Sequence, residues 1–131
     1  MFVTTALLAA GALVFVSAAV QHLNTVGSKG LAFVFTDRAT PLSREGFAGR
    51  AARTLQNNLE SAAMVVPALA TLVALGASNP VVEAAAAIYV AARVVFTASY
   101  WAGVNALRSA SWGIGMAMIA MLTVNAALTG A

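Results

Sequence analysis

Hydrophobic positions form four long runs along the chain, and polar or turn-forming residues separate them. A membrane-spanning helix needs roughly 20 apolar residues, and each run is long enough to form one. The first break, over residues 26–49, collects glycines, a proline and charged residues, so it is expected to be the one long loop. The pattern predicts four helices, over about residues 2–24, 47–76, 81–104 and 109–130.

Composition places these helices in a membrane. The 131 residues are 61% hydrophobic and 8% charged, and their mean hydropathy is +0.88. So few polar side chains do not cover the surface of a soluble globule of this size. The predicted fold class is an all-α integral membrane protein, a four-transmembrane-helix bundle that forms a single domain over residues 1–131 with the lipid bilayer as its partner.

Charge and side-chain chemistry narrow the function classes. The net charge is +3, but the basic residues are too sparse to form a phosphate-tracking patch, so nucleic-acid binding is not expected. The chain has no cysteine and one histidine, so no metal site is expected, and thiol chemistry requires a thiol supplied by a ligand. Basic residues gather in the first and third loops, so the positive-inside rule places these loops in the cytoplasm and both termini outside.

A polar stripe marks the start of the second predicted helix. Arg50, Arg53, Asn57 and Glu60 are spaced by three and four residues, which places them on one helical face. At 1.5 Å per residue the helix is roughly 43 Å long, which exceeds the hydrocarbon core. Its first turns should therefore project into the polar interface.

Arg93 lies near the middle of the third helix, where an arginine costs at least about 2.5 kcal/mol in a bilayer. Glu60 is the only acidic residue at comparable depth on the same side, so an Arg93–Glu60 ion pair is the simplest interpretation. Together with Arg50, Arg53 and Arg108 there are four positive charges against one, which is unfavourable in a low dielectric. A ligand with several carboxylates would relieve this, because guanidinium groups bind carboxylates in two-pronged fashion.

The long loop contains an apolar run from Leu31 to Phe35. Three interpretations are open for this run. It is an ordered connector, which is the simplest reading, or it lies at the membrane interface, or it covers a site.

The polar stripe also resembles the signature of a known family. Arg53, Asn57 and Glu60, after an Arg-Ala start at Arg50, are similar to the second-helix pattern of MAPEG, the membrane-associated proteins of eicosanoid and glutathione metabolism.

The later helices extend this resemblance. Arg93 is followed seven positions later by Tyr100, as in the third helix of the family, and Arg108 falls near the arginine that family enzymes place beside a thiol. Phe96 stands where some members have a tyrosine or a histidine.

The resemblance implies a homotrimer with sites between neighbouring subunits and glutathione as co-substrate. Arg108 would be the catalytic residue, because an adjacent cation favours the thiolate, which is the nucleophile. The residues that the resemblance assigns to glutathione binding are Arg53, Asn57, Glu60, Arg93 and Tyr100.

The expected function is a membrane-bound, glutathione-dependent transferase or peroxidase that acts on lipophilic electrophiles arriving from the lipid. The alternative is a non-catalytic lipid-binding or scaffolding membrane protein of the same fold, since the family includes a fatty-acid-presenting member without enzyme activity. A transporter is disfavoured, because Pro67 alone interrupts the apolar runs. The alanine- and valine-rich composition and short loops favour a bacterial plasma membrane.

Overall fold

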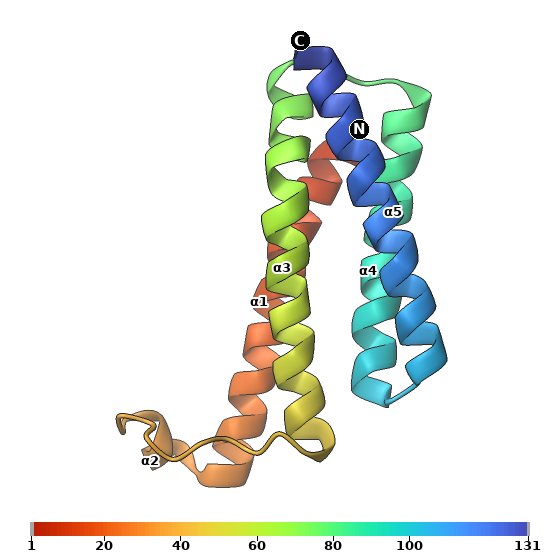
Figure 1. Ribbon diagram of the computed structural model, residues 1–131. Helices are drawn as coiled ribbons and strands as arrows, with labels where there is room; N and C mark the ends of the chain where they lie inside the picture. Colours follow the sequence, from red (N-terminus) through yellow and green to blue (C-terminus); the bar gives the residue numbers. More distant parts are fainter. Residues whose placement is uncertain (1, 131) are drawn as a thin grey trace.

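The computed structural model describes residues 2–130, which contain four long helices and one short one (Figure 1). The first and last residues of the predicted domain, 1 and 131, lie outside the described range. The helix bounds are α1 Phe2–Lys29, α2 Leu31–Val34, α3 Gly46–Ala74, α4 Pro80–Ala102 and α5 Asn105–Gly130. The described part contains no strand, so the predicted all-α class is confirmed.

The long helices form two pairs. α1 packs most extensively on α3, and α4 packs most extensively on α5, whereas α3 and α4 make few contacts with each other. In Figure 1 both ends of the described chain lie at one end of the bundle, and the long connection with α2 lies at the other. The large buried side chains gather toward the end that holds the chain termini; they include Leu69, Leu72, Tyr89 and Leu122.

Local sequence fixes both ends of α4. The Asn79 side chain accepts hydrogen bonds from Val81 N at 2.9 Å and from Val82 N at 3.0 Å, and Pro80 occupies the first helical position. At the other end Gly103 has φ 79°, a left-handed conformation that glycine adopts without strain. The chain therefore turns tightly into α5.

Two helix ends differ from the prediction. α1 continues to Lys29 rather than ending near residue 24, because Gly30, with φ 84°, is the first residue to leave the helical conformation. α5 begins at Asn105 rather than at residue 109, so Arg108 lies in its first turn and not in a loop. The predicted long loop contains the short helix α2.

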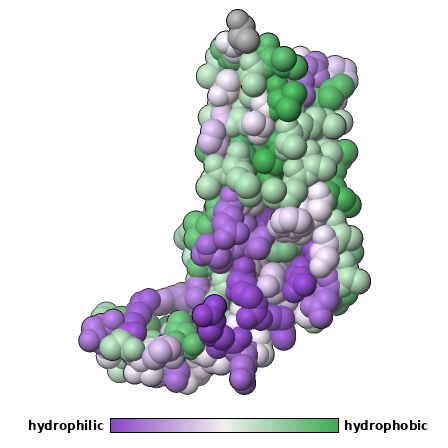
Figure 2. Space-filling model, in the orientation of Figure 1, coloured by the Kyte–Doolittle hydropathy of each residue, from purple (hydrophilic) through white to green (hydrophobic). Residues whose placement is uncertain are grey.

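The helices have the length and composition of a membrane protein. Within residues 2–130, α1, α4 and α5 are each long and apolar enough to cross a bilayer. The space-filling view shows hydrophilic residues concentrated toward the end that carries α2, and hydrophobic residues toward the other end (Figure 2). The molecule therefore has one polar end, and the site described next lies there.

Candidate functional site

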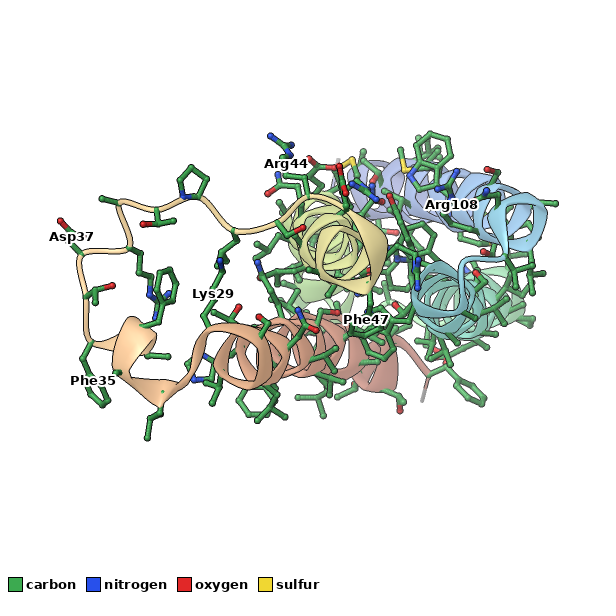
Figure 3. All side chains as sticks on the ribbon, turned by 90° about the horizontal axis from the view of Figure 1, so that it is seen from below. Lys29, Phe35, Asp37, Arg44, Phe47 and Arg108 are labelled. Carbon is green, nitrogen blue, oxygen red and sulfur yellow. The ribbon has the colours of Figure 1, made fainter. Side chains whose placement is uncertain are left out.

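Three arginines meet at the polar end of the bundle. Arg50 and Arg53 come from the first turns of α3, and Arg108 comes from the first turn of α5. The view from this end shows Arg108 on the side of the bundle from which Arg44 also projects (Figure 3). Helix ends thus gather positive charge at the polar end of the bundle.

Tyr100 connects two of these arginines. Its hydroxyl accepts a hydrogen bond from Arg53 Nε at 3.1 Å, and the Arg108 guanidinium carbon lies 4.8 Å from the centre of its ring. A cation within about 6 Å of an aromatic face is attracted by the ring quadrupole. One tyrosine on α4 therefore orients side chains from α3 and α5.

The stacking continues into the bundle. Phe96, one turn before Tyr100, meets that ring edge to face with centroids 5.4 Å apart. The Arg93 guanidinium carbon lies 4.1 Å from the centre of the Phe96 ring. The order Arg93, Phe96, Tyr100, Arg108 forms a continuous cation–aromatic stack that runs from the buried interior to the polar end, and we refer to it as the Arg93–Arg108 stack.

Arg50 ties α3 to the end of α4. Its Nε donates to the Trp101 carbonyl at 3.1 Å, and its guanidinium carbon lies 5.8 Å from the centre of the Phe47 ring. The last carbonyls of a helix lack partners within the helix and carry partial negative charge, which a guanidinium satisfies. Arg50 is thus occupied by a structural contact.

A groove of about 580 Å³ opens beside the stack. This volume falls within the range of roughly 300–1,000 Å³ that is usual for small-molecule sites. Its walls combine cationic, amide, hydroxyl and aromatic groups, from Asn57, Phe96, Tyr100, Arg108, Ser109, Trp112 and Gly113. Such a set suits a ligand with both an anionic part and an apolar part.

A MAPEG family model matches residues 1–128 of the chain. The chain belongs to the MAPEG family. A comparison with curated proteins gives no match, and a comparison with solved structures gives none either. The predicted family is therefore confirmed over nearly the whole length.

In this MAPEG chain, four predicted site residues lie close together. Asn57, Tyr100 and Arg108 line the groove, and Arg53 is joined to it through the Tyr100 hydroxyl. Arg53 Nη1 also donates to the Arg44 carbonyl at 3.2 Å, which anchors the long connection beside the site.

The other two predicted residues do not line the groove, and the predicted Arg93–Glu60 ion pair is wrong. Glu60 is exposed on the outer face of α3, where its carboxylate accepts from Gln56 Nε2 at 2.9 Å. Arg93 is only 2% exposed, and its Nη2 donates to the Asn58 side-chain oxygen. The two residues share a depth in the MAPEG bundle but point in different directions around it.

Asn58 is the residue that sequence reasoning missed. It is 3% exposed, and its Nδ2 donates to Ser17 Oγ at 2.8 Å and to Thr97 Oγ1 at 3.1 Å. It therefore joins α1, α3 and α4 and also receives the Arg93 guanidinium. A pattern in the sequence does indicate it: Thr54, Asn58 and Ser61 form a second series of polar residues spaced by three and four, which predicts a second polar face on this helix.

Proposed function

We propose that this protein is a membrane-bound, glutathione-dependent transferase or peroxidase that acts on lipophilic electrophiles. Family membership supports the class, because MAPEG members generally use glutathione. The observation that carries the proposal is that the Arg108 guanidinium is not paired with an anion from the described part of the chain. Within residues 2–130 its guanidinium interacts only with the Tyr100 ring, so it faces the groove without an anionic partner.

Arg108 would be the catalytic residue in this proposal. A free thiol has a pKa near 8.5 and is mostly protonated at neutral pH, whereas an adjacent arginine favours the thiolate. The thiol proton leaves to solvent, and the thiolate then forms a bond to an electrophilic carbon while the bond from that carbon to a leaving group breaks and the leaving group departs with the electron pair. With a peroxide, two glutathione thiols are oxidised to one disulfide while the peroxide is reduced to an alcohol and water.

The binding roles follow from the positions of the polar groups. Arg53 has the chemistry to bind a glutathione carboxylate, while the Asn57 amide and the Tyr100 hydroxyl supply hydrogen bonds. Arg93, which is buried, would act on the ligand indirectly by supporting Phe96 and Tyr100 in the stack. Glu60 faces outward and would contribute from a neighbouring subunit.

The outward polar residues of α3 also support the proposed assembly. Gln56 and Glu60 are exposed on a 29-residue helix that also carries the apolar stretch up to Ala74. We propose that α3 is the fourth membrane-spanning helix and that the protein is a homotrimer, since subunit contacts would cover a polar stripe that lipid does not solvate. We further propose a bacterial plasma membrane, with the polar end cytoplasmic and both termini outside.

A second groove, which is apolar, favours the non-catalytic alternative. It lies between α1 and α4, has a volume of about 330 Å³ and contains almost no polar surface; its walls include Leu13, Val16, Val94 and Trp101. Such a groove fits an acyl chain, as a lipid-binding or scaffolding protein would require. Lipid binding with indifference to glutathione would support that function.

Calorimetric titration with glutathione tests the proposal, with ultraviolet thiolate absorbance recorded in parallel. Wild-type protein in detergent is compared with Arg53→Ala, Arg108→Ala and the control Arg38→Ala, which removes the same charge from the long connection. We expect Arg53→Ala to lose binding, Arg108→Ala to lose thiolate absorbance, and Arg38→Ala to retain both. Folded wild-type protein that binds no glutathione at millimolar concentration would refute the function.

A further inference from the structure

The segment that follows α1 projects sideways from the polar end of the bundle. Figure 1 shows α2 and the connection to α3 extending away from the long helices. Among the helices of residues 2–130, α2 contacts only α1. Gly30 makes this direction possible, because its φ of 84° ends α1 and turns the chain.

This segment exposes large apolar side chains. Phe35 is 83% exposed and Leu31 is 61% exposed, and both stand clear of the hydrophobic core. The view along the bundle places Phe35 and Asp37 at the edge farthest from the long helices (Figure 3). Neighbouring apolar side chains exposed to this degree mark an interaction surface.

The length of α1 places the segment at the level of the lipid headgroups. Its 28 residues span roughly 42 Å at 1.5 Å per residue. A bilayer including its headgroups is about 40–45 Å thick. A helix that begins at one surface of the membrane therefore ends at the other, and the residues that follow Lys29 lie at the headgroup level.

Basic residues flank the apolar ones. Lys29 ends α1 and Arg38 follows the turn after Phe35, and within the described chain neither has an acidic partner. Asp37 accepts from Ala39 N at 3.1 Å, so its carboxylate supports the turn. An apolar segment flanked by cations is the pattern of elements that lie in the membrane interface.

We propose that residues 29–38 form an interfacial anchor that lies on the bilayer surface beside the subunit. Leu31 and Phe35 insert at the boundary between headgroups and acyl chains, while Lys29 and Arg38 contact lipid phosphates. This inference goes beyond the proposed catalytic function and does not depend on it. It selects the membrane interface among the three interpretations of the apolar run.

Spin labelling tests the anchor directly, because the chain has no cysteine and one introduced cysteine gives one label. Phe35→Cys and Asp37→Cys are labelled in the full chain in vesicles of phosphatidylcholine and phosphatidylglycerol. Phe15→Cys, at a position that is 74% exposed on α1, is the control for a lipid-facing label. The measurement is the collision rate of each label with oxygen, which concentrates in lipid, and with a water-soluble nickel chelate.

The anchor predicts a several-fold higher ratio of oxygen to nickel collisions at position 35 than at position 37. Combining Lys29→Gln with Arg38→Gln should shift the ratio at position 35 toward that at position 37. A ratio at position 35 that equals that at position 37 and lies far below that of the lipid-facing control at position 15 would place the segment in water and overturn the proposal. A label at position 35 that is shielded from both reagents would overturn it as well, because the segment would then be covered by protein.

Discussion

The buried contact between Arg93 and Asn58 permits a quantitative test of the bundle interior. Asn58→Leu replaces the amide with a side chain of similar size and removes three contacts, to Ser17, Thr97 and Arg93. Hydrogen bonds between membrane helices average about 0.6 kcal/mol each, so the two hydroxyl contacts contribute roughly 1.2 kcal/mol. The charge-assisted contact adds about 1.5–3 kcal/mol. The expected loss of stability is therefore roughly 3–4 kcal/mol.

Most of this loss of stability would arise because the buried Arg93 guanidinium, which is 2% exposed, loses its amide partner in the variant. The second variant, Arg93→Met, removes the charge. Replacing a whole buried polar network by apolar side chains is often nearly neutral. We therefore expect Asn58→Leu combined with Arg93→Met to be about 2 kcal/mol more stable than Asn58→Leu alone.

The assay is reversible unfolding in mixed micelles of increasing dodecyl sulfate content, followed by tryptophan fluorescence. All variants are compared at one protein concentration, because dissociation of an oligomer makes the midpoint concentration-dependent. If the two substitutions destabilise the protein additively, the Arg93–Asn58 contact carries no coupling and the reasoning is refuted.

Two further substitutions probe the site. Gly49→Ala would place a Cβ 1.9 Å from the Arg44 carbonyl oxygen, so the connection between α2 and α3 must move at a cost of about 1–3 kcal/mol. The control in the same unfolding assay is Gly11→Ala, where a Cβ meets nothing within 4 Å. Equal unfolding midpoints for the two variants would contradict the clash. Tyr100→Phe keeps the ring but removes the hydroxyl that is proposed to bind glutathione and that accepts from Arg53 Nε. Loss of the bond to the ligand should lower glutathione affinity about fivefold, equivalent to about 1 kcal/mol. A rise in affinity on titration would instead mean that the tyrosine competes with the ligand for Arg53.

The sequence was sufficient to predict the long helices and which end of the bundle gathers the candidate residues. Length and hydropathy determine where an apolar helix runs. Because successive helices reverse direction, the start of the second long helix and the junction of the last two lie at one end, where the structure has Asn57, Tyr100 and Arg108. The helix ends were predicted less well. α1 continues to Lys29 through polar residues that the hydropathy pattern assigned to a loop, because their backbone remains hydrogen-bonded until Gly30 turns the chain.

The direction of each polar side chain around its helix was not predictable. Asn57 and Asn58 are adjacent, and each belongs to a series spaced by three and four residues, so periodicity alone does not tell which series faces inward. The structure buries Asn58 and leaves Glu60 exposed. Depth in the bundle alone predicts Glu60 as the ion-pair partner of Arg93. A partner must also face Arg93, however, and the direction in which a side chain points depends on how the helices pack.

The tie between α3 and α4 at the polar end has a consequence for ligand affinity. Arg50 donates to the Trp101 carbonyl, and Arg53 donates to the Tyr100 hydroxyl and to the Arg44 carbonyl. An anion that recruits either guanidinium must exchange these internal bonds for new ones, so its affinity measures a difference between two sets of contacts. Within residues 2–130 the Arg108 guanidinium has no such bond to give up, so Arg108 would supply the larger net gain.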